Sequence, residues 1–320
     1  MAQLELDQIA YRHPAGLRLE NISFSLASGH VGALVGASGS GKTTLLKLIA
    51  GFLTPQAGSI RINQQDISTP SWQQAPHHRG VGLVFQQHAL LPHLTAAQNI
   101  AFGFRGDKKA GQERTQALLA DFRILPLAGR YPHQLSGGEA QRVALARAMA
   151  AQPSILLMDE PFSSIDSALR RQLRQECMQV LRQAGITVLL VTHDAEEAME
   201  LADQIIVLED GRIAQQDTAH EVYYHPKTPH VASLFGEINH LREPKLIASL
   251  TGTAATELLI RPEAILLVDG AGVEGTITQM YYRGNHEILH VLMEGGITLK
   301  VHAHHHHYSI GQRVRLAVQE

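Results

Sequence analysis

The fold of this chain is decided by the stretch Gly36-Ala37-Ser38-Gly39-Ser40-Gly41-Lys42-Thr43-Thr44. It fits the pattern G-x-x-x-x-G-K-[ST], a glycine-rich loop whose backbone N–H groups cradle phosphates. An apolar run at 31–35 precedes it as a buried strand would, and residues 45–50 follow with helical spacing and end at Gly51, a helix-stop residue. Lys42 is expected to reach the β- and γ-phosphates and the Thr43 hydroxyl to ligate Mg²⁺. The stretch therefore predicts a site for a nucleoside triphosphate.

Composition limits the kind of protein that carries this loop. The chain has 320 residues, of which 44% are hydrophobic and 18% charged, and a net charge of −3. That length allows two domains, and the charge gives no basic excess that would favour nucleic acid as a partner. The single cysteine, Cys177, excludes a disulfide within the chain, as expected in a reducing compartment. No run approaches the roughly 18 apolar residues that cross a membrane, so any membrane role is expected to depend on a separate partner chain.

The middle of the chain has the pattern of an α/β domain. Apolar runs at 31–35, 155–158 and 187–191 are bounded by helical segments, which predicts a parallel sheet buried on both faces. Residues 88–151 are mostly helical in pattern, with Thr95 as the N-cap of one helix and a polar loop between Gly106 and Gly111. A hairpin with its turn at Asp210-Gly211 is expected to close the sheet.

The two ends of the chain predict further β structure. Residues 4–8 alternate apolar and polar side chains, which indicates a half-buried edge strand. Tyr11 follows, and its ring could either stack on a nucleotide base or face solvent from that edge strand. Beyond about 240, short strands separated by glycine turns predict a small all-β domain. We expect its strands at 258–260, 264–268, 275–280, 288–292, 297–301 and 314–318.

Acidic residues close one of the apolar strands. Asp159 and Glu160 follow residues 155–158, and ligands bind at the carboxyl ends of strands in open α/β sheets. Asp159 is expected to hold Mg²⁺, and Glu160 to act as the general base or to position the attacking water. The alternative, a solvated strand end, is disfavoured by the phosphate loop in the same chain.

The segment Ser136-Gly137-Gly138-Glu139 has a structural and a functional interpretation. Ser136 as N-cap and Glu139 three residues later form a capping box. Two glycines and a hydroxyl at a helix start also form a second anion site. One nucleotide cannot easily use two such helix starts from one subunit. We therefore expect a dimer in which each chain supplies its second site to the nucleotide of the other.

These motifs together resemble the nucleotide-binding subunit of an ATP-binding cassette (ABC) transporter. The matching elements are a Walker A loop at 36–44, a Q-loop at Gln86, the signature at 135–142, Walker B at 155–160, a D-loop at 163–166 and a switch histidine at His193. They occur in the family's order, and other phosphate-loop NTPases lack the signature. The resemblance implies an α/β fold, with a phosphate-loop NTPase domain at 1–236, a helical subdomain at about 88–151, and a small all-β domain at 237–320 for regulation or dimerisation.

The resemblance also implies roles for single residues in a homodimer that encloses two ATP molecules. ATP would be bound by Tyr11 at the adenine, by Gly36, Ala37, Ser38, Gly39, Ser40, Gly41, Lys42, Thr43 and Thr44, by Ser136, Gly137 and Gly138 of the partner, and by Asp166. Mg²⁺ would be held by Thr43, Gln86 and Asp159. The catalytic residues would be Glu160, His193 and Gln86, with His193 holding the γ-phosphate and the attacking water. Glu139 in place of the commoner Gln, and Ile165 in place of the usual Leu, are not expected to impair catalysis.

The C-terminal region narrows the resemblance to one class of ABC transporter. Arg261-Pro262-Glu263 followed by short strands resembles the β-domain of importer ATPases for sugars, polyamines, phosphonates and ferric iron. The residues at 36–39, 45–46 and 50–52 favour the ferric-iron type. The resemblance implies an ATPase on the cytoplasmic face of the bacterial inner membrane, bound to integral permease subunits and indirectly to a periplasmic binding protein, without nucleic acid. The permease is expected to contact Leu90-Leu91-Pro92-His93 in the helical subdomain.

Two questions stay open at this point. The histidine tract at His302 and 304–307, with His286 and His290 nearby in sequence, is either a solvated loop or a metal-binding segment that slows import. The competing function is a soluble ABC ATPase of DNA repair or translation. Such proteins usually carry two cassettes or a long coiled-coil insertion, whereas this chain has one cassette and no heptad run. A small-molecule kinase would lack the signature.

Overall fold

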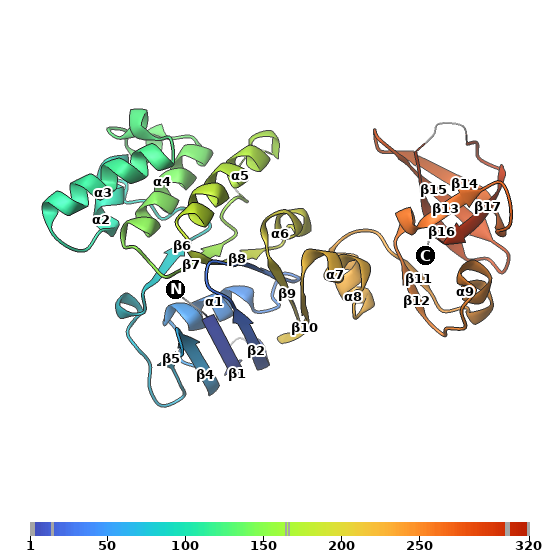
Figure 1. Cartoon of the computed structure of the whole chain (residues 1–320), viewed down its shortest axis with the longest axis horizontal. Helices are drawn as coiled ribbons and strands as arrows, with labels where there is room; N and C mark the ends of the chain where they lie inside the picture. Colours follow the sequence, from blue (N-terminus) through green and yellow to red (C-terminus); the bar gives the residue numbers. More distant parts are fainter. Residues whose placement is uncertain (1–3, 14–15, 164, 166, 305–307, 319–320) are drawn as a thin grey trace. The chain divides into compact units, whose positions relative to one another are not determined.

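The computed structural model describes residues 4–13, 16–163, 165, 167–304 and 308–318 (Figure 1). The chain divides into two compact units, Met1–His220 and Glu221–Glu320. The segment 221–236, which the sequence assigns to the ATPase domain, belongs to the second unit in this division. The functional boundary at 236 stays a prediction.

The central sheet of the first unit has six strands. They are β3 (Val31–Val35), β6 (Val81–Val84), β7 (Ile155–Asp159), β8 (Thr187–Thr192), β9 (Gln204–Glu209) and β10 (Arg212–Asp217), in the order β10-β9-β3-β8-β7-β6. Neighbours from β9 to β6 run parallel, and β10 returns antiparallel to β9. Asp210 and Gly211 form the turn with φ angles of 45° and 75°, which suit a tight hairpin. The predicted parallel sheet and its closing hairpin are confirmed.

Helices cover both faces of this sheet. One face carries α1 (Lys42–Ala50), and the other carries α2 (Ala96–Gly103), α3 (Lys108–Asp121), α4 (Gly137–Ala150) and α5 (Ser167–Gln183), while α6 (Ala195–Leu201) follows β8 (Figure 1). On β7, Ile155 and Leu157 join the core beneath α1, whereas Leu156 and Met158 join the core beneath α2 to α5. Successive side chains of a strand point to opposite faces. A strand covered on both faces is therefore apolar throughout.

A second, antiparallel sheet contains β1 (Leu4–Arg12), β2 (Arg18–Leu26), β4 (Ala57–Ile62) and β5 (Gln65–Ser68), in the order β2-β1-β4-β5. The prediction that residues 4–8 form an edge strand is wrong, because β1 pairs with β2 on one side and with β4 on the other. Alternation along a strand reports that one face is buried. It does not report which distant strand pairs with each edge.

Helices dominate the segment 88–151 as its sequence pattern predicted, with one difference inside it, while its bounds as a subdomain stay a prediction. Besides α2 to α4, it contains short 3-10 turns at Leu125–Leu127 and Pro132–Gln134, and another, Pro76–His78, precedes β6. Thr95 caps α2 by accepting from the Gln98 N–H, as predicted. Gly111, expected at the end of a loop, lies inside α3, where an added Cβ would stand 2.9 Å from the Phe104 ring. Close packing on that ring explains a glycine within a helix. Among the described residues, no helix combines the length and apolar character needed to span a membrane.

Helix α7 (Ala219–Tyr224) spans the point in the sequence where the second unit begins. The second unit is built on a five-stranded sheet. Its elements are α8 (Pro229–Leu234), β11 (Asn239–Leu241), α9 (Pro244–Thr251), β12 (Leu258–Ile260), a 3-10 turn (Pro262–Ala264), β13 (Ile265–Val268), β14 (Val273–Tyr282), β15 (Glu287–Met293), β16 (Thr298–Ala303) and β17 (Arg313–Val318). The sheet order is β13-β17-β14-β15-β16, and β11 pairs with β12. Every predicted strand is present. The sequence did not predict α9, which buries Leu246, Ile247 and Leu250 and ends at Gly252.

Candidate nucleotide-binding site

The loop between β3 and α1 adopts a conformation that only glycines allow. Gly39 and Gly41 have φ angles of 82° and 111°, a region that side chains with a Cβ rarely enter. A Cβ added to Gly36 would stand 2.2 Å from the carbonyl oxygen of Leu208. Gly41 is the N-cap of α1 and offers no side chain as a cap. The first N–H groups of α1 are therefore left without a side-chain acceptor at the point where an anion would bind.

Lys42 points back into this loop. Its ammonium donates to the carbonyl oxygens of Gly36 at 2.7 Å and of Ala37 at 2.9 Å, and the residue is buried. Burial lowers the pKa of Lys42, while the nearby Glu160 and Asp159 carboxylates act in the opposite direction. An ammonium has three donors, so the two contacts to carbonyls still allow a bond to a phosphate oxygen.

Oxygen ligands lie at the same end of the sheet. The Thr43 hydroxyl donates to Asp159 Oδ1 at 3.4 Å. Burial, together with the negative charge of Glu160, raises the pKa of Asp159. A hydroxyl and a half-buried carboxylate beside a second carboxylate are the kind of ligands that Mg²⁺ prefers. The donor set therefore fits the predicted ion.

The three predicted catalytic residues lie together. Glu160 Oε1 is 3.0 Å from His193 Nδ1, and Glu160 Oε2 accepts from Gln86 Nε2 at 3.2 Å. The three residues follow β7, β8 and β6, which are neighbours in the sheet. Glu160 has a φ of 45° and donates its N–H to Val191 O at 2.9 Å. A non-glycine residue in this region is strained, and such strain is concentrated at functional sites.

A pocket of about 480 Å³ includes residues of the phosphate loop together with Glu160 and His193. It is lined by Leu17, Ser38, Gly39, Gly41, Lys42, Thr43, Thr44, Glu160 and His193. Ser40 is buried within the loop behind this surface. Tyr11 lies on β1, and among the described residues it is not part of the lining of this pocket. Its stacking on adenine therefore stays a prediction.

The signature segment forms its own pocket. Ser136 caps α4 and makes the predicted capping box with Glu139, whose carboxylate accepts from Ser136 N at 2.7 Å. This hydrogen bond lowers the pKa of Glu139. A pocket of about 360 Å³ is lined by Ser136, Gly137, Gly138, Glu139, Arg142, Ile165, Leu169, Gln172 and Leu173. It shares none of these residues with the phosphate-loop pocket, and Asp166 of the predicted D-loop lies outside the described residues.

The histidine tract is only partly described. His302 lies on β16, with its ring 4.4 Å from that of His286, and the His304 ring is 6.5 Å from His286. In the described part of the chain, no group of three or more His, Cys, Asp or Glu residues could hold a metal ion. Residues 305–307 lie outside the described residues, so metal binding by the whole tract stays a prediction.

Sequence reasoning missed a group of charged residues behind His193. Arg174 on α5 and Glu197 on α6 are both buried, next to the loop that carries the imidazole. Their signal in the sequence is weak, because Arg and Glu at helical spacing usually form an exposed, charged face. Only the packing of α5 against that loop distinguishes them.

Two family models match this chain, and known proteins are similar to it over most of its length. The ABC transporter family model matches residues 19–163, and the TOBE domain model matches residues 258–320. A sulfate/thiosulfate import ATP-binding protein, CysA of Synechocystis, is 41% identical over 292 residues, covering 86% of this chain and 80% of that protein. An Fe(3+) ions import ATP-binding protein, FbpC of Pseudomonas fluorescens, is 40% identical over 306 residues, covering 89% and 86%.

A solved structure agrees with the fold of the first unit. The dimeric, post-hydrolysis state of the ATP-binding cassette MJ0796, bound to ADP and Pi, superposes with a TM-score of 0.59. It is 31% identical and covers 68% of this chain and 98% of its own. Together with the phosphate loop, the Glu160–His193 pair and the separate signature pocket, these likenesses determine the family. The chain belongs to the ABC transporters as an ATP-hydrolysing subunit of the import type, with an ATP-binding domain followed by a TOBE domain.

Proposed function

We propose that this chain is the ATPase subunit of a bacterial ferric-iron importer and works as a homodimer on the cytoplasmic face of the inner membrane. The observation that carries the hydrolytic part is the pair of Glu160 and His193 in the lining of the phosphate-loop pocket, with Gln86 in contact with Glu160. ATP is the substrate. The remaining proposals concern the roles of these residues, the partner chains and the solute.

In the proposed reaction, the loop N–H groups and Lys42 bind the phosphates of ATP. Thr43 and Asp159 would hold Mg²⁺, with Gln86 as a further ligand, and this ion supplies charge neutralisation on the phosphates. Glu160 accepts a proton from the attacking water, and the His193 imidazole keeps the carboxylate and the water in place. The strained backbone of Glu160 supports this assignment, because the fold keeps that residue in an unfavourable conformation.

A homodimer is proposed because one chain has two separate candidate anion sites. The phosphate-loop pocket and the signature pocket share no lining residue. A second copy could place Ser136, Gly137 and Gly138 against the nucleotide of the first. The ADP-bound relative of known structure was solved as a dimer, which supports this arrangement. Sedimentation of the Glu160→Gln variant with and without ATP tests it, and a monomer in both conditions would contradict it.

A permease segment is proposed to dock beside the Q-loop. A groove of about 500 Å³ there includes Phe85, Leu91 and Phe102 in its lining. The Phe85 and Phe102 side chains are exposed, at 44% and 68%, and exposed apolar residues that line a groove favour a site of interaction with another protein. Phe85 precedes Gln86, so a helix seated in this groove would contact the residue next to the catalytic set. Crosslinks from Leu91 to the permease test the placement, and crosslinks found only elsewhere would contradict it.

The solute is the least constrained part. Relatives of nearly equal identity are named for sulfate or thiosulfate and for Fe(3+), so identity alone does not choose between them. Polyamines, phosphonates and sugars remain alternatives. The test is ATP turnover by the chain reconstituted with its permease and with binding proteins loaded with ferric iron, a polyamine or sulfate. Stimulation by the ferric-iron protein alone is expected, and stimulation by another loaded protein would replace iron with that solute.

A further inference from the structure

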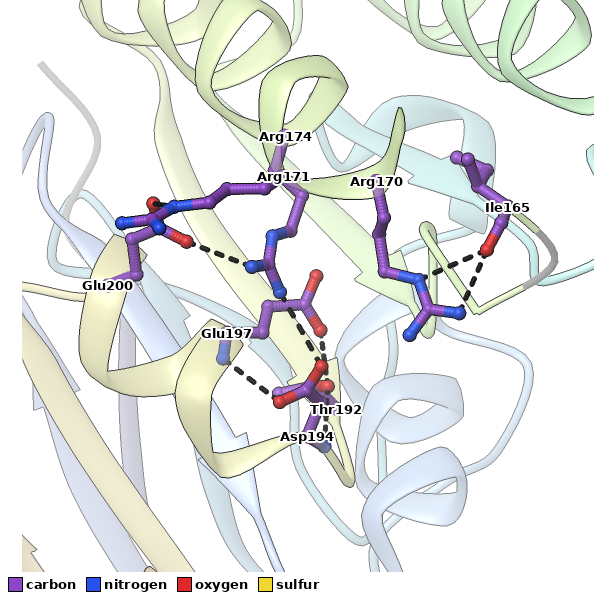
Figure 2. A network of polar contacts seen from close by, with 8 residues as sticks. All are labelled: Ile165, Arg170, Arg171, Arg174, Thr192, Asp194, Glu197 and Glu200. Atoms are coloured by element: carbon purple, nitrogen blue, oxygen red, sulfur yellow. Dashed lines mark hydrogen bonds and ion pairs between the residues drawn. The ribbon is translucent and has the colours of Figure 1, made fainter. Parts of the chain in front are cut away.

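A network of polar contacts joins α5, α6 and the two chain neighbours of His193, Thr192 and Asp194 (Figure 2). It contains three arginines of α5, the last residue of β8, the N-cap residue of α6 and two glutamates of α6: Arg170, Arg171, Arg174, Thr192, Asp194, Glu197 and Glu200. The proposed reaction uses none of these side chains. Arg174 and Glu197 are nevertheless only 5% and 4% exposed. Arg174 pairs with Asp194 and Glu200, and a buried ion pair is often no more stabilising than well-packed apolar residues, so stability alone does not account for it.

Arg174 joins carboxylates from two segments. Its Nη1 donates to Asp194 Oδ2 at 3.5 Å, and its Nη2 donates to Glu200 Oε2 at 2.9 Å. Figure 2 shows the guanidinium reaching from α5 to both groups. A guanidinium is planar and presents its donors in a fixed fork. The position of Asp194 relative to α5 and α6 is therefore set by one rigid group.

Asp194 follows His193 directly and is held by further contacts. Its Oδ1 accepts from the Glu197 N–H at 3.1 Å, as the N-cap of α6. Its own N–H donates to Thr192 Oγ1 at 3.0 Å, and the Thr192 hydroxyl donates to the Glu197 carboxylate. Both chain neighbours of His193 are thus held from behind. The direction in which the imidazole points depends on them, because His193 itself is largely exposed.

Helix α5 also holds the segment that follows Glu160. Arg170, one helical turn before Arg174, donates from Nε and Nη2 to the carbonyl oxygen of Ile165 at 3.1 and 2.8 Å. The two arginines therefore attach one rigid helix to both loops whose side chains meet in the His193–Glu160 pair. Moving either contact would change the distance between imidazole and carboxylate.

We propose that Arg174 is a positioning residue for ATP hydrolysis: it holds Asp194 so that the His193 imidazole stays within hydrogen-bonding reach of Glu160. This inference rests on the proposed role of His193. Among the described residues, Arg174 is not part of the lining of the phosphate-loop pocket, so its effect on the reaction is indirect and passes through the residues that it holds. Displacing a catalytic group by 1 Å can cost about 10²-fold in rate. Loss of the Arg174–Asp194 contact is therefore expected to lower turnover without weakening nucleotide binding.

The test uses Asp194→Asn as its main variant, in the full chain. Asparagine caps a helix as well as aspartate does, so α6 keeps its cap and only the charge facing Arg174 is lost. Arg174→Gln removes the other partner, and Arg174→Lys keeps the charge without the fork. Arg171→Gln is the matched control, because Arg171 is 75% exposed and its recorded ion pair is with Glu200.

The expected result is a lower kcat with a nearly unchanged KM for ATP. Asp194→Asn and Arg174→Gln lower kcat by about 10- to 100-fold, with KM for ATP within about twofold of the unmodified chain. Arg174→Lys recovers part of the loss, and Arg171→Gln behaves like the unmodified chain. Melting temperature and the Kd of a fluorescent ATP analogue are measured on the same samples.

Two results would overturn the proposal. One is a folded Asp194→Asn variant whose kcat stays within about twofold of that of Arg171→Gln. The other is a parallel loss of kcat, nucleotide binding and melting temperature in both Asp194→Asn and Arg174→Gln, which is the behaviour of a purely structural pair. His193→Ala is measured alongside. If that variant hydrolyses ATP normally, the proposed role of His193 fails, whereas an inactive His193→Ala beside a normal Asp194→Asn refutes only the positioning role.

Discussion

His193 Nδ1 lies 3.0 Å from Glu160 Oε1, and the two residues come from the ends of neighbouring parallel strands. In the register of β7 and β8, Asp159 pairs with Val191, so the residues that follow each strand emerge at the same edge of the sheet. The imidazole and the carboxylate can therefore contact the same water molecule, which can donate to the carboxylate. The following predictions concern this pair, the loop that faces it, the groove beside it and the buried carboxyl behind it.

Replacing Glu160 with Gln is expected to reduce ATP turnover by about 10²–10⁴-fold while ATP still binds, because the amide keeps the shape of the side chain but cannot accept the proton. Turnover is measured by phosphate release and binding by a fluorescent ATP analogue. Glu196→Gln, which neutralises an exposed glutamate of α6, is the control. A Glu160→Gln variant with the turnover of this control would remove Glu160 from the catalytic set.

The Gly36→Ala variant should bind ATP more weakly and unfold at a lower temperature. Its Cβ would stand 2.2 Å from the Leu208 carbonyl, which forces the loop away from β9. Overpacking of this kind typically costs about 1–3 kcal/mol. Gly129→Ala is the matched control, since nothing lies within 4 Å of the added methyl. Calorimetry gives the unfolding temperature of both variants, and ATP titration gives their affinity for ATP. Equal ATP affinities would mean that the loop accommodates the added methyl group.

Phe102→Glu should reduce the stimulation of ATPase activity by the permease and its loaded binding protein. Phe102 is 68% exposed at the proposed docking groove, and a carboxylate there would be costly to bury against an apolar partner helix. Leu125→Glu changes a comparably exposed apolar residue that is not among those lining the groove. The measured quantity is the ratio of stimulated to basal turnover. An unchanged ratio for Phe102→Glu would place the permease elsewhere.

Glu197 should make stability depend on pH in a specific direction. Burial raises its pKa to about 7, and Asp194 acts in the same direction, while the Thr192 hydrogen bond and the charges of Arg174 and Arg170 oppose the rise. The ordinary value is 4.5. Because the folded protein binds this proton more tightly than the unfolded chain does, the stabilising contribution is complete below about pH 4.5 and is lost as the pH rises through about 7.

The variant Glu197→Gln, which carries no such proton, should therefore have a flatter stability profile over this range. The difference between its free energy of unfolding and that of the unmodified chain should change by up to about 3 kcal/mol between pH 4.5 and pH 8, in favour of the variant at the higher pH. Urea unfolding at pH 5, 6.5 and 8 measures it. Glu196→Gln serves again as the exposed control, and parallel profiles for Glu197→Gln and the unmodified chain would show that Glu197 is ionised throughout.

The local sequence pattern was sufficient to predict a structural feature wherever that feature lies within one turn or at one helix end. The helix stop at Gly51, the caps at Thr95 and Ser136 and the turn at Asp210-Gly211 were all predicted and are present. Each depends on backbone dihedral angles or on a hydrogen bond within a few residues. The residues that make such contacts are close to one another in the sequence.

Contacts between distant segments were predicted only in part. The sequence predicted the parallel sheet and placed Asp159 at the end of one of its strands, yet it placed β1 at the edge of a sheet in which β1 is internal. The apolar runs of the parallel strands and the alternation along β1 are equally clear in the sequence. Strand order, however, depends on which segments pair over long sequence separations. Alternating side chains carry no information about that choice.

By itself, the amino-acid sequence determined the phosphate loop, the acidic strand end, the capped signature helix and the β-rich C-terminal unit, because glycine conformations, helix caps and apolar periodicity act over short distances. Only the tertiary structure decided that Glu160, His193 and Gln86 touch, that the signature pocket is separate, and that Arg174 lies behind the catalytic loop. These relationships arise when α5, β6, β7 and β8 pack into one core. A buried Arg between two carboxylates is indistinguishable in sequence from an exposed charged face until that packing is known.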